Sequence, residues 1–178
     1  FFPSLNDAKS LLALIQKADT IARTLTSQYE IIVINDGSTD DTASVLSNLM
    51  KHYPKLRTIT HKHNRGYGAA LISGFAAARY DWVFYTDGDG QYDPSELAGL
   101  ARLVRPNIDV VNGYKIHRAD NWVRTLIGWI YNRYAHAITR LPIRDVDCDF
   151  RLIRASALKR VKLESQTGTR SEEHTSEL

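Results

Sequence analysis

The chain has 178 residues, of which 43% are hydrophobic, and these values fit one globular domain with a core of ordinary size. Its formal net charge of +3 is compatible with anionic ligands or an anionic membrane surface. The single cysteine, Cys148, excludes an internal disulfide framework, no zinc-site spacing is present, and no run approaches the roughly 18 apolar residues of a membrane-spanning helix.

The first 35 residues predict a strand, a helix and a second strand. Residues 1–3 are typical of the end of a strand whose beginning is missing. Apolar residues over 6–25 recur with a helical period, which predicts an amphipathic helix capped by Asn6 or Asp7. The run EIIVIN, residues 30–35, is continuous and β-branched, typical of a strand buried on both faces of a parallel sheet. The later elements expected are helices over 41–51, 66–78 and 94–104 and strands over 56–60, 82–86, 108–112 and 149–154.

Strands and helices therefore alternate along most of the chain, joined by short loops. This order predicts an α/β fold with a Rossmann-like, doubly wound, mostly parallel sheet and helices on both faces. Such sheets bind ligands at the carboxyl ends of their strands. Asp36 and Asp87 each directly follow a predicted strand, so we expect both in the binding site.

The stretch TDGDGQYD, residues 86–93, concentrates acidic side chains in one turn. Asp87 and Asp89 flank Gly88 at the end of an apolar strand, and two neighbouring carboxylates are costly unless a cation compensates them. Their hard oxygens favour Mg²⁺ or Mn²⁺, which need only one or two carboxylates when a ligand supplies phosphate oxygens. The turn therefore predicts half of a metal–diphosphate site.

Three other interpretations of this turn compete with a metal–diphosphate site. A calcium-binding EF-hand loop does not fit, because its sixth position is Tyr92 rather than glycine and its twelfth is Ala98 rather than glutamate. A haloacid-dehalogenase-type phosphatase also places two such aspartates after an apolar strand, although Gln91 replaces the usual threonine or valine. In the third interpretation, the turn is solvated and its acids only cap the helix that follows.

Two further motifs lie at predicted strand and helix ends. In NDGSTDDT, Asp36 is placed to accept hydrogen bonds from a nucleobase or ribose, unless the run only caps the next helix. In HNRGYGAALISGF, Gly66 and Gly68 let the backbone approach an anion at a helix N-terminus, or serve tight helix packing. The G-x-G-x-x-G dinucleotide fingerprint fails because residue 71 is leucine, and there is no P-loop.

Six segments, taken in order, resemble the motifs of the family 2 glycosyltransferases with the GT-A fold: FFPSLNDA, VINDGSTDDT, NRGYGAALISGF, YTDGDGQYDPSEL, VNGYKIHR and IRDVDCDFRLIR. The resemblance is to the branch of dolichyl-phosphate mannose synthase and the polyprenyl-phosphate glycosyltransferases. It covers residues 1–163, which we expect to form one catalytic domain truncated at both ends. We expect 164–178 to be a non-native or disordered tail, in which RSEEHTSEL, 170–178, resembles a translated sequencing adapter.

The resemblance implies a site for a nucleoside diphosphate-sugar with GDP or UDP as the nucleotide. Asp36 would bind the nucleobase, and Asp87, Asp89 and Gln91 would surround a Mg²⁺ or Mn²⁺ ion, with Asp89 counted among the catalytic residues. Lys115 and Arg118 are candidates to bind and stabilise the departing diphosphate, because cationic groups favour its developing charge. The remaining donor-binding candidates are Pro3, Asn6, Asp7, Gly66, Gly68 and Gly88, and at Asp7 the family usually has glutamate.

The acceptor half of the site is expected after residue 112. Asp145 matches an acid that the family places near the acceptor, and Asp147 and Asp149 are close to it in sequence. Such an acid serves as general base toward a hydroxyl acceptor. Toward a lipid phosphate it positions groups instead, because a phosphate monoester has a second pKa of about 6 and is already nucleophilic at pH 7.

Residues 120–140 combine aliphatic side chains at helical spacing with tryptophan and arginine, which favours a helix at a membrane interface over a core helix with solvated arginines. The resulting prediction is an inverting transfer to a polyprenyl phosphate at the cytoplasmic face of a membrane. The alternatives are a saccharide hydroxyl acceptor and a nucleotide-binding fragment without turnover. Nucleic-acid binding is not expected, since no RNA-type aromatic motif accompanies the basic residues.

Overall fold

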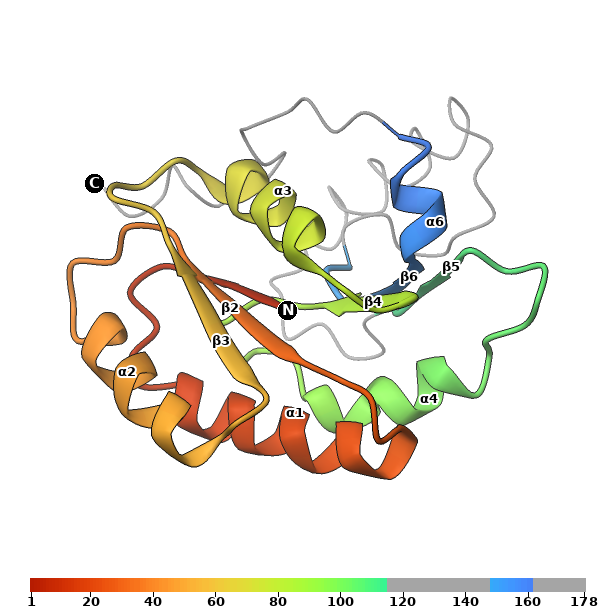
Figure 1. Ribbon diagram of the computed structural model, residues 1–178, viewed down its shortest axis with the longest axis horizontal. Coiled ribbons are helices and arrows are strands. Elements are labelled where there is room, and N and C mark those ends of the chain that lie inside the picture. Colours follow the sequence, from red (N-terminus) through yellow and green to blue (C-terminus); the bar gives the residue numbers. More distant parts are fainter. Residues whose placement is uncertain (115–147, 162–178) are drawn as a thin grey trace, which may run out of the picture.

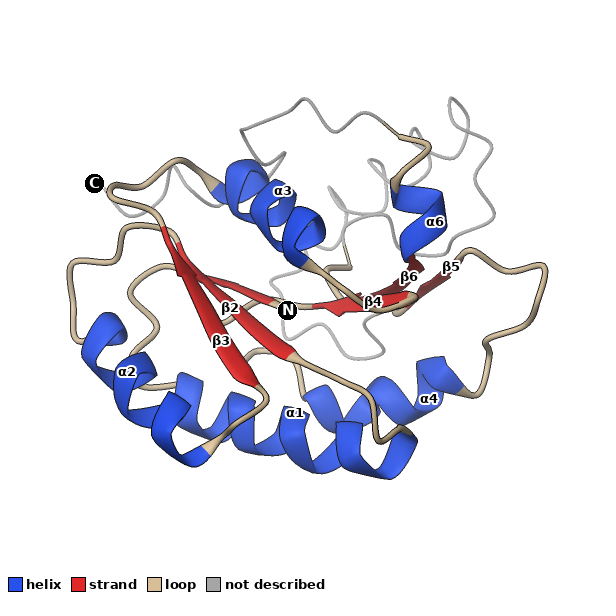
Figure 2. Ribbon diagram, in the orientation of Figure 1, coloured by secondary structure: helices blue, strands red, loops and turns tan. Residues whose placement is uncertain are grey.

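Two layers of helices enclose a central sheet in the computed structural model, which describes residues 1–114 and 148–161 (Figures 1 and 2). On one side lie α1 (Leu11–Leu25), α2 (Thr42–His52) and α4 (Leu97–Ala101), the last preceded by the short 3₁₀ helix η1 (Pro94–Glu96). On the other side lie α3 (Tyr67–Ala77) and α6 (Ala155–Leu158). The strands are β1 (Phe2–Ser4), β2 (Ile31–Asn35), β3 (Leu56–Thr60), β4 (Trp82–Tyr85), β5 (Val110–Asn112) and β6 (Arg151–Arg154).

The strands form two three-stranded groups that meet between β1 and β4. In the first group β1, β2 and β3 are parallel, and in the second β6 lies between β4 and β5 and is antiparallel to both. The Phe1 amino group donates to the Phe84 carbonyl at 2.6 Å, and the Gly88 N–H donates to the Pro3 carbonyl at 3.0 Å. These contacts continue the sheet in the order β3-β2-β1-β4-β6-β5, so the predicted mostly parallel α/β sheet is confirmed, with β6 as the reversed strand.

Strand β2 is buried on both faces, as its continuous apolar run predicted. Ile31 and Val33 pack in one cluster with apolar residues of α1 and α2. Ile32 and Ile34 point the other way, into a cluster with Ala70 of α3 and side chains of β4 and α6. Because side chains alternate along a strand, only a run without polar interruptions supplies both layers.

Two predicted helices begin differently from expectation. The helix predicted over 6–25 starts at Leu11, because Asn6 takes a left-handed conformation with φ of 60° and Ser10 stands at the N-cap. Asp93 caps the helix predicted over 94–104, with its carboxylate accepting the Ser95 N–H at 3.0 Å, but the first turn is the 3₁₀ helix η1 and α4 ends at Ala101. The other predicted elements within the described residues agree to within two residues at each end. No helix in 1–114 or 148–161 combines the length and apolar character needed to cross a bilayer.

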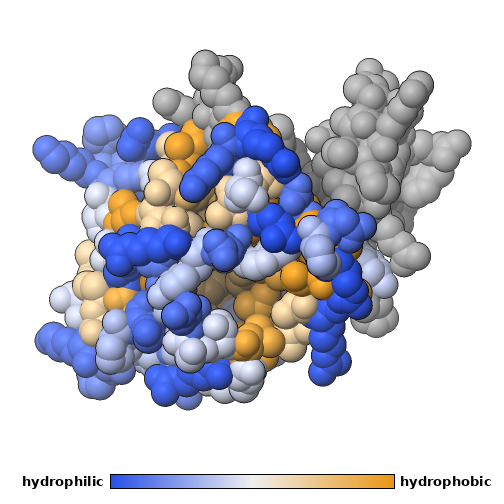
Figure 3. All heavy atoms as spheres, turned by 45° about the vertical axis from the view of Figure 1, so that its right-hand side comes forward, coloured by the Kyte–Doolittle hydropathy of each residue, from blue (hydrophilic) through white to orange (hydrophobic). Residues whose placement is uncertain are grey.

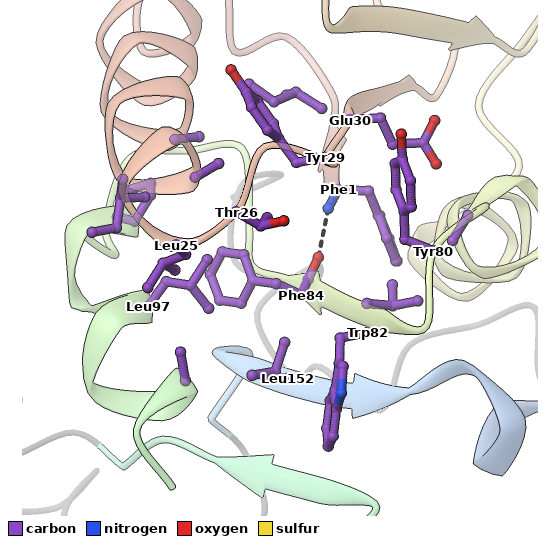
Figure 4. Close-up of a pocket in the computed structure, with 18 of the residues that line it drawn as sticks. Phe1, Leu25, Thr26, Tyr29, Glu30, Tyr80, Trp82, Phe84, Leu97 and Leu152 are labelled. Carbon is purple, nitrogen blue, oxygen red and sulfur yellow. Dashed lines mark hydrogen bonds between the residues drawn. The ribbon is translucent and has the colours of Figure 1, made fainter. Parts of the chain in front are cut away.

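An apolar pocket of about 460 Å³ opens near the amino ends of β2 and β4, with α1 and α4 on its other side (Figures 3 and 4). Figure 4 shows the Phe1–Phe84 hydrogen bond beside it, with Leu25, Leu97 and Trp82 around the opening. The acidic residues of the predicted site lie at the opposite, carboxyl ends of the strands. The candidate functional site therefore lies at those carboxyl ends and not in this larger pocket.

Adjacent leucines in α1 provide a test of how the helix packs. Leu11 is fully buried and Leu12 is 53% exposed. We expect Leu11→Ala to lower the free energy of unfolding by about 2 to 5 kcal/mol, because it leaves a cavity under the sheet. Leu12→Ala, the matched control, should change it by about 0.5 kcal/mol or less. Urea unfolding followed by circular dichroism measures both, and equal losses would contradict this orientation of α1.

Candidate active site at the carboxyl ends of the strands

A polar cleft of about 190 Å³ lies where β1, β2 and β4 end. It brings together residues that are up to 86 positions apart in sequence, from the end of β1, the loops after β1, β2, β3 and β4, and the start of α3. The lining residues are Pro3, Ser4, Leu5, Asp7, Asp36, Asn64, Tyr67, Ala70, Asp87, Gly88 and Asp89.

The acidic turn after β4 packs closely against the end of β1 and the loop that follows it. Besides the bond from the Gly88 N–H to Pro3, the Gly88 carbonyl accepts from the Ser10 hydroxyl at 2.6 Å. A Cβ atom at position 88 would lie 2.7 Å from the Pro3 carbonyl oxygen and 3.1 Å from Oδ2 of Asp7. Position 88 therefore requires glycine for this close approach, which also brings Asp7 toward the turn.

Asp7 lies in a concentration of negative charge. Its Oδ2 accepts the Leu5 N–H at 3.0 Å. Burial raises the pKa of Asp7 above its ordinary value, and the nearby carboxylates of Asp89 and Asp40 raise it further. The carboxylate form of Asp7 is thus disfavoured in the folded protein, and a cation bound in the cleft would relieve this repulsion.

The Asp87 side chain is held in place by a hydrogen bond from α3. Its side chain is buried, with 4% of the residue exposed, and Oδ1 accepts the Tyr67 hydroxyl at 2.9 Å. Burial, followed by the negative charges of Asp87 and Asp149, raises the pKa of Tyr67, so this hydroxyl stays protonated and remains a donor at neutral pH. Asp149, which the sequence offered with Asp145 and Asp147 as a candidate general base toward the acceptor, is therefore close enough to act on the same cluster.

Asp36 is held in the same way from β3. Its Oδ1 lies 2.5 Å from Nδ1 of His61 and accepts the Arg65 N–H at 3.0 Å. The other ring nitrogen of His61 lies 2.9 Å from the Ser73 hydroxyl of α3. Neither His61 nor Tyr67 was predicted from the sequence as a site residue. The available signal was position, because His61 directly follows β3 and Tyr67 lies between the two glycines of the NRGYG motif.

Asn6 joins the loops after β1 and β2. Its amide oxygen accepts the Thr39 N–H at 2.9 Å and the Asp40 N–H at 3.3 Å, and its own N–H donates to the Ser38 hydroxyl at 2.9 Å. The amide oxygen is therefore committed to the protein, and the predicted contact of Asn6 with a donor substrate stays a prediction.

The predicted site residues fall into three groups. The first lines the cleft and comprises Pro3, Asp7, Asp36, Asp87, Gly88 and Asp89. The second lies within two residues of lining residues without lining the cleft and comprises Asn6, Gly66, Gly68 and Gln91, the last of which donates its N–H to Asp89 Oδ1 at 2.9 Å. The third lies outside the described residues and comprises Lys115, Arg118, Asp145 and the 120–140 segment.

The cleft offers a divalent cation carboxylate oxygens but not a complete set of protein ligands. Within 1–114 and 148–161, no group of three or more His, Cys, Asp or Glu residues is arranged to hold a metal ion. Asp87 and Asp89 supply hard oxygens, and Asp7 lies beside them, with its pKa raised first by burial and then by the Asp89 and Asp40 carboxylates. This arrangement fits an ion such as Mg²⁺ or Mn²⁺ that takes one or two carboxylates and completes its shell with water and phosphate oxygens.

Comparisons with known sequences place these residues in a family context. Residues 2–162 match the family described as Glycosyl transferase family 2. An undecaprenyl-phosphate 4-deoxy-4-formamido-L-arabinose transferase of Serratia proteamaculans is 32% identical over 154 residues, covering 85% of this chain and 47% of that protein. A dodecaprenyl-phosphate galacturonate synthase of Rhizobium johnstonii is 30% identical over 167 residues, covering 90% and 48%. The chain thus spans about half the length of these curated relatives.

Solved structures share the fold at lower sequence identity. A mannosyltransferase from Pyrobaculum calidifontis, in complex with GDP-Man and Mn²⁺, superposes with a TM-score of 0.63 and 18% identity, covering 93% of this chain and 46% of that chain. The glucosyl-3-phosphoglycerate synthase of Mycobacterium tuberculosis, in complex with Mn²⁺, UDP-Glc and phosphoglyceric acid, gives a TM-score of 0.66 and 19% identity, covering 88% and 56%. These similarities confirm the GT-A architecture.

The close approach at Gly88 makes a stability prediction. Gly88→Ala should lower the free energy of unfolding by about 1 to 3 kcal/mol, because its methyl group would displace the β1 backbone or the Asp7 carboxylate. Gly99→Ala is the matched control, since a Cβ atom at Gly99 meets nothing within 4 Å in α4. It should raise stability by about 0.5 to 1 kcal/mol through helix propensity. Thermal unfolding of both variants decides whether the Gly88 contact is as tight as described.

The raised pKa of Asp7 makes a pH prediction. The pKa of Asp7 is higher in the folded protein than in the unfolded chain, so ionisation of Asp7 destabilises the fold. The contribution of Asp7 to the free energy of unfolding is therefore fully present at low pH and is lost as pH rises through the raised pKa. Asp7→Asn keeps the acceptor for the Leu5 N–H and removes the charge. We expect this variant to melt above wild type at pH 7 and close to it at pH 3. Asp81→Asn, an exposed control, should match wild type at both, and an Asp7→Asn variant that melts lower at pH 7 would contradict the charge argument.

Proposed function

The chain belongs to glycosyl transferase family 2, and on that premise we propose that it forms the donor-binding catalytic domain of a metal-dependent, inverting glycosyltransferase. The donor is a GDP- or UDP-sugar and the acceptor is a polyprenyl phosphate. The observation that carries the proposal is the meeting, in one cleft, of Asp36 after β2 with the Asp87–Gly88–Asp89 turn after β4. The family match weighs against the phosphatase interpretation of that turn.

Each part of the cleft suits one part of a nucleotide-sugar. Asp36 offers a carboxylate oxygen to the N–H or O–H donors of a base or ribose. Asp87 and Asp89 would hold the divalent ion, which when bound supplies positive charge against the departing diphosphate. The chain contributes preorganisation, because Tyr67 fixes Asp87 and the Pro3 carbonyl fixes Gly88 before any ligand arrives. The two solved structures in complex with GDP-Man and UDP-Glc both contain Mn²⁺, which supports a divalent ion here.

The acceptor assignment rests on the curated relatives, which are named as undecaprenyl-phosphate and dodecaprenyl-phosphate enzymes. A phosphate acceptor is already largely ionised at pH 7, so the site needs positioning groups more than a strong base. We propose that Asp145 has this positioning role, that Lys115 and Arg118 stabilise the leaving diphosphate, and that 120–140 lies on the cytoplasmic face of a membrane. These residues lie outside the described part of the chain, and their roles rest on the sequence.

Nucleotide titrations test the donor site. We expect either GDP or UDP to bind with Mn²⁺ present and to bind at least about tenfold more weakly without it, because the acidic cleft otherwise repels the diphosphate. Asp89→Ala should remove this metal-dependent gain. Asp81→Ala is the matched control, since Asp81 lies at the opposite end of β4 from the cleft. Isothermal titration calorimetry measures the binding of GDP and of UDP, each with and without Mn²⁺, to wild type and to both variants. Failure of both nucleotides to bind the folded wild-type protein would overturn the proposal.

A transfer assay then tests the acceptor with the nucleotide-sugar that contains the bound base. Radiolabelled sugar should pass to undecaprenyl phosphate in detergent micelles, and the product should be a glycosyl phosphate of inverted anomeric configuration. Transfer only to a saccharide hydroxyl would move the assignment to the second acceptor class. Metal-dependent binding with no transfer to either acceptor would identify a nucleotide-binding domain without turnover.

A further inference from the structure

We propose that His61 is a positioning residue of the donor site, which fixes the Asp36 carboxylate so that one defined oxygen is presented to the nucleobase. The inference rests on the proposed function, because it concerns how the same cleft recognises its donor. Nothing in the family match or in the named relatives assigns a role to this histidine.

The position of His61 follows from the pairing of β2 with β3. Its backbone N–H donates to the Asn35 carbonyl at 2.9 Å, which extends the parallel pairing one residue past the end of β3. This bond sets the histidine beside Asp36, the residue after Asn35. The two side chains are 5% and 6% exposed, so their contact at 2.5 Å is shielded from water.

The chemistry of the two partners determines which ring nitrogen holds the proton. A carboxylate only accepts hydrogen bonds, so Nδ1 of His61 must be the protonated nitrogen that donates to Asp36. In the neutral ring Nε2 is then an acceptor, and the Ser73 hydroxyl donates a hydrogen bond to it at 2.9 Å. Ser73 of α3 therefore fixes the ring from behind, and both nitrogens are satisfied.

The consequence for Asp36 is that its two oxygens differ. Oδ1 takes both contacts from the described residues, the His61 ring and the Arg65 N–H. Oδ2 is left for a ligand, and Asp36 lines the cleft. Two donors on Oδ1 oppose rotation of the carboxylate, which would otherwise exchange the oxygens. A fixed acceptor selects ligands whose N–H or O–H group lies at the matching point, because a misplaced donor leaves buried polar groups unpaired.

The order Ser73–His61–Asp36 also matches that of the serine hydrolase triad, but the surroundings do not suit that chemistry. Ser73 lies inside α3, which runs from Tyr67 to Ala77. The backbone N–H groups around it are committed to the helix and do not form an oxyanion hole. The triad-like geometry therefore serves to hold Asp36.

The first measurement tests the geometry without any ligand. Long-range ¹H–¹⁵N NMR of uniformly ¹⁵N-labelled protein distinguishes the two neutral histidine tautomers, and the His61→Asn variant assigns the signal. We expect His61 to be the Nδ1-protonated form, with a strongly downfield proton from the short bond to Asp36. An Nε2-protonated His61, or one that exchanges freely between tautomers, would overturn the proposal whether or not a nucleotide binds.

The second measurement tests the consequence for recognition. His61→Leu removes the donor to Asp36, whereas His61→Asn retains an amide N–H near the place of Nδ1. We expect His61→Leu to weaken binding of the nucleotide with Mn²⁺ by about tenfold or more, and to raise KM for the donor with less change in kcat. His61→Asn should recover most of this loss. His52→Leu, a change at an exposed histidine of α2, should have no effect.

The outcomes separate this proposal from the proposed function. If wild type binds GDP or UDP and His61→Leu binds it equally well, the positioning role is wrong and the donor site stands. If His61→Asn is as weak as His61→Leu, the ring serves packing and does not position Asp36, which also overturns the proposal. If wild type binds neither nucleotide, the proposed function fails, and the positioning role fails with it.

Discussion

The backbone contact between β1 and the turn after β4 is the interaction on which the candidate site depends. The first sheet group ends at β1 and the second begins at β4, and the hydrogen bond from the Gly88 N–H to the Pro3 carbonyl joins them at the edge where the acids lie. The bond is possible only because position 88 has no side chain. It brings Asp89 near Asp7 and sets the distance between the end of β4 and Asp36 on the far side of β1. A shift of this one contact would separate the two halves of the cleft.

The unit formed by β3 and α3 supports both buried acids of the cleft. Asp36 receives its donor from His61 after β3, and Asp87 receives its donor from Tyr67 at the start of α3. An unpaired buried carboxylate is costly, so each acid that projects into the cleft needs such a partner behind it. The Asp7 carboxylate instead accepts the local backbone N–H of Leu5 at 3.0 Å, and burial raises the pKa of Asp7. Asp36 and Asp87 are thus fixed by side chains from neighbouring elements, whereas the carboxylate form of Asp7 is disfavoured chiefly by burial.

The sequence predicted the parts of this arrangement that depend on short stretches. The unbroken run at 31–34 indicated a strand buried on both faces, and acids directly after strands indicated the edge where the cleft lies. Pairing across the sheet was not accessible in this way. Three features depend on neighbours that no local pattern specifies. They are the place of β6 between β4 and β5, the contact of His61 with a residue 25 positions earlier, and the left-handed Asn6, after which α1 begins later than predicted. For this reason, the site residues that the sequence missed are the supporting ones, and the acids that it predicted are those that line the cleft.

The charge of the cleft implies that metal and nucleotide bind to the proposed site as a coupled pair. Asp7, Asp87 and Asp89 line one cleft, and the Asp89 and Asp40 carboxylates add to burial in raising the pKa of Asp7, so a diphosphate alone adds charge of the wrong sign. Among residues 1–114 and 148–161, a divalent ion alone finds few protein ligands, and one oxygen of Asp87 is engaged by Tyr67. Together the ion and the diphosphate supply each other's missing ligands and cancel the excess charge. By thermodynamic linkage, if the bound ion increases nucleotide affinity by a certain factor, the bound nucleotide increases ion affinity by the same factor. An acidic turn that binds each partner weakly alone is therefore selective for the complex of both.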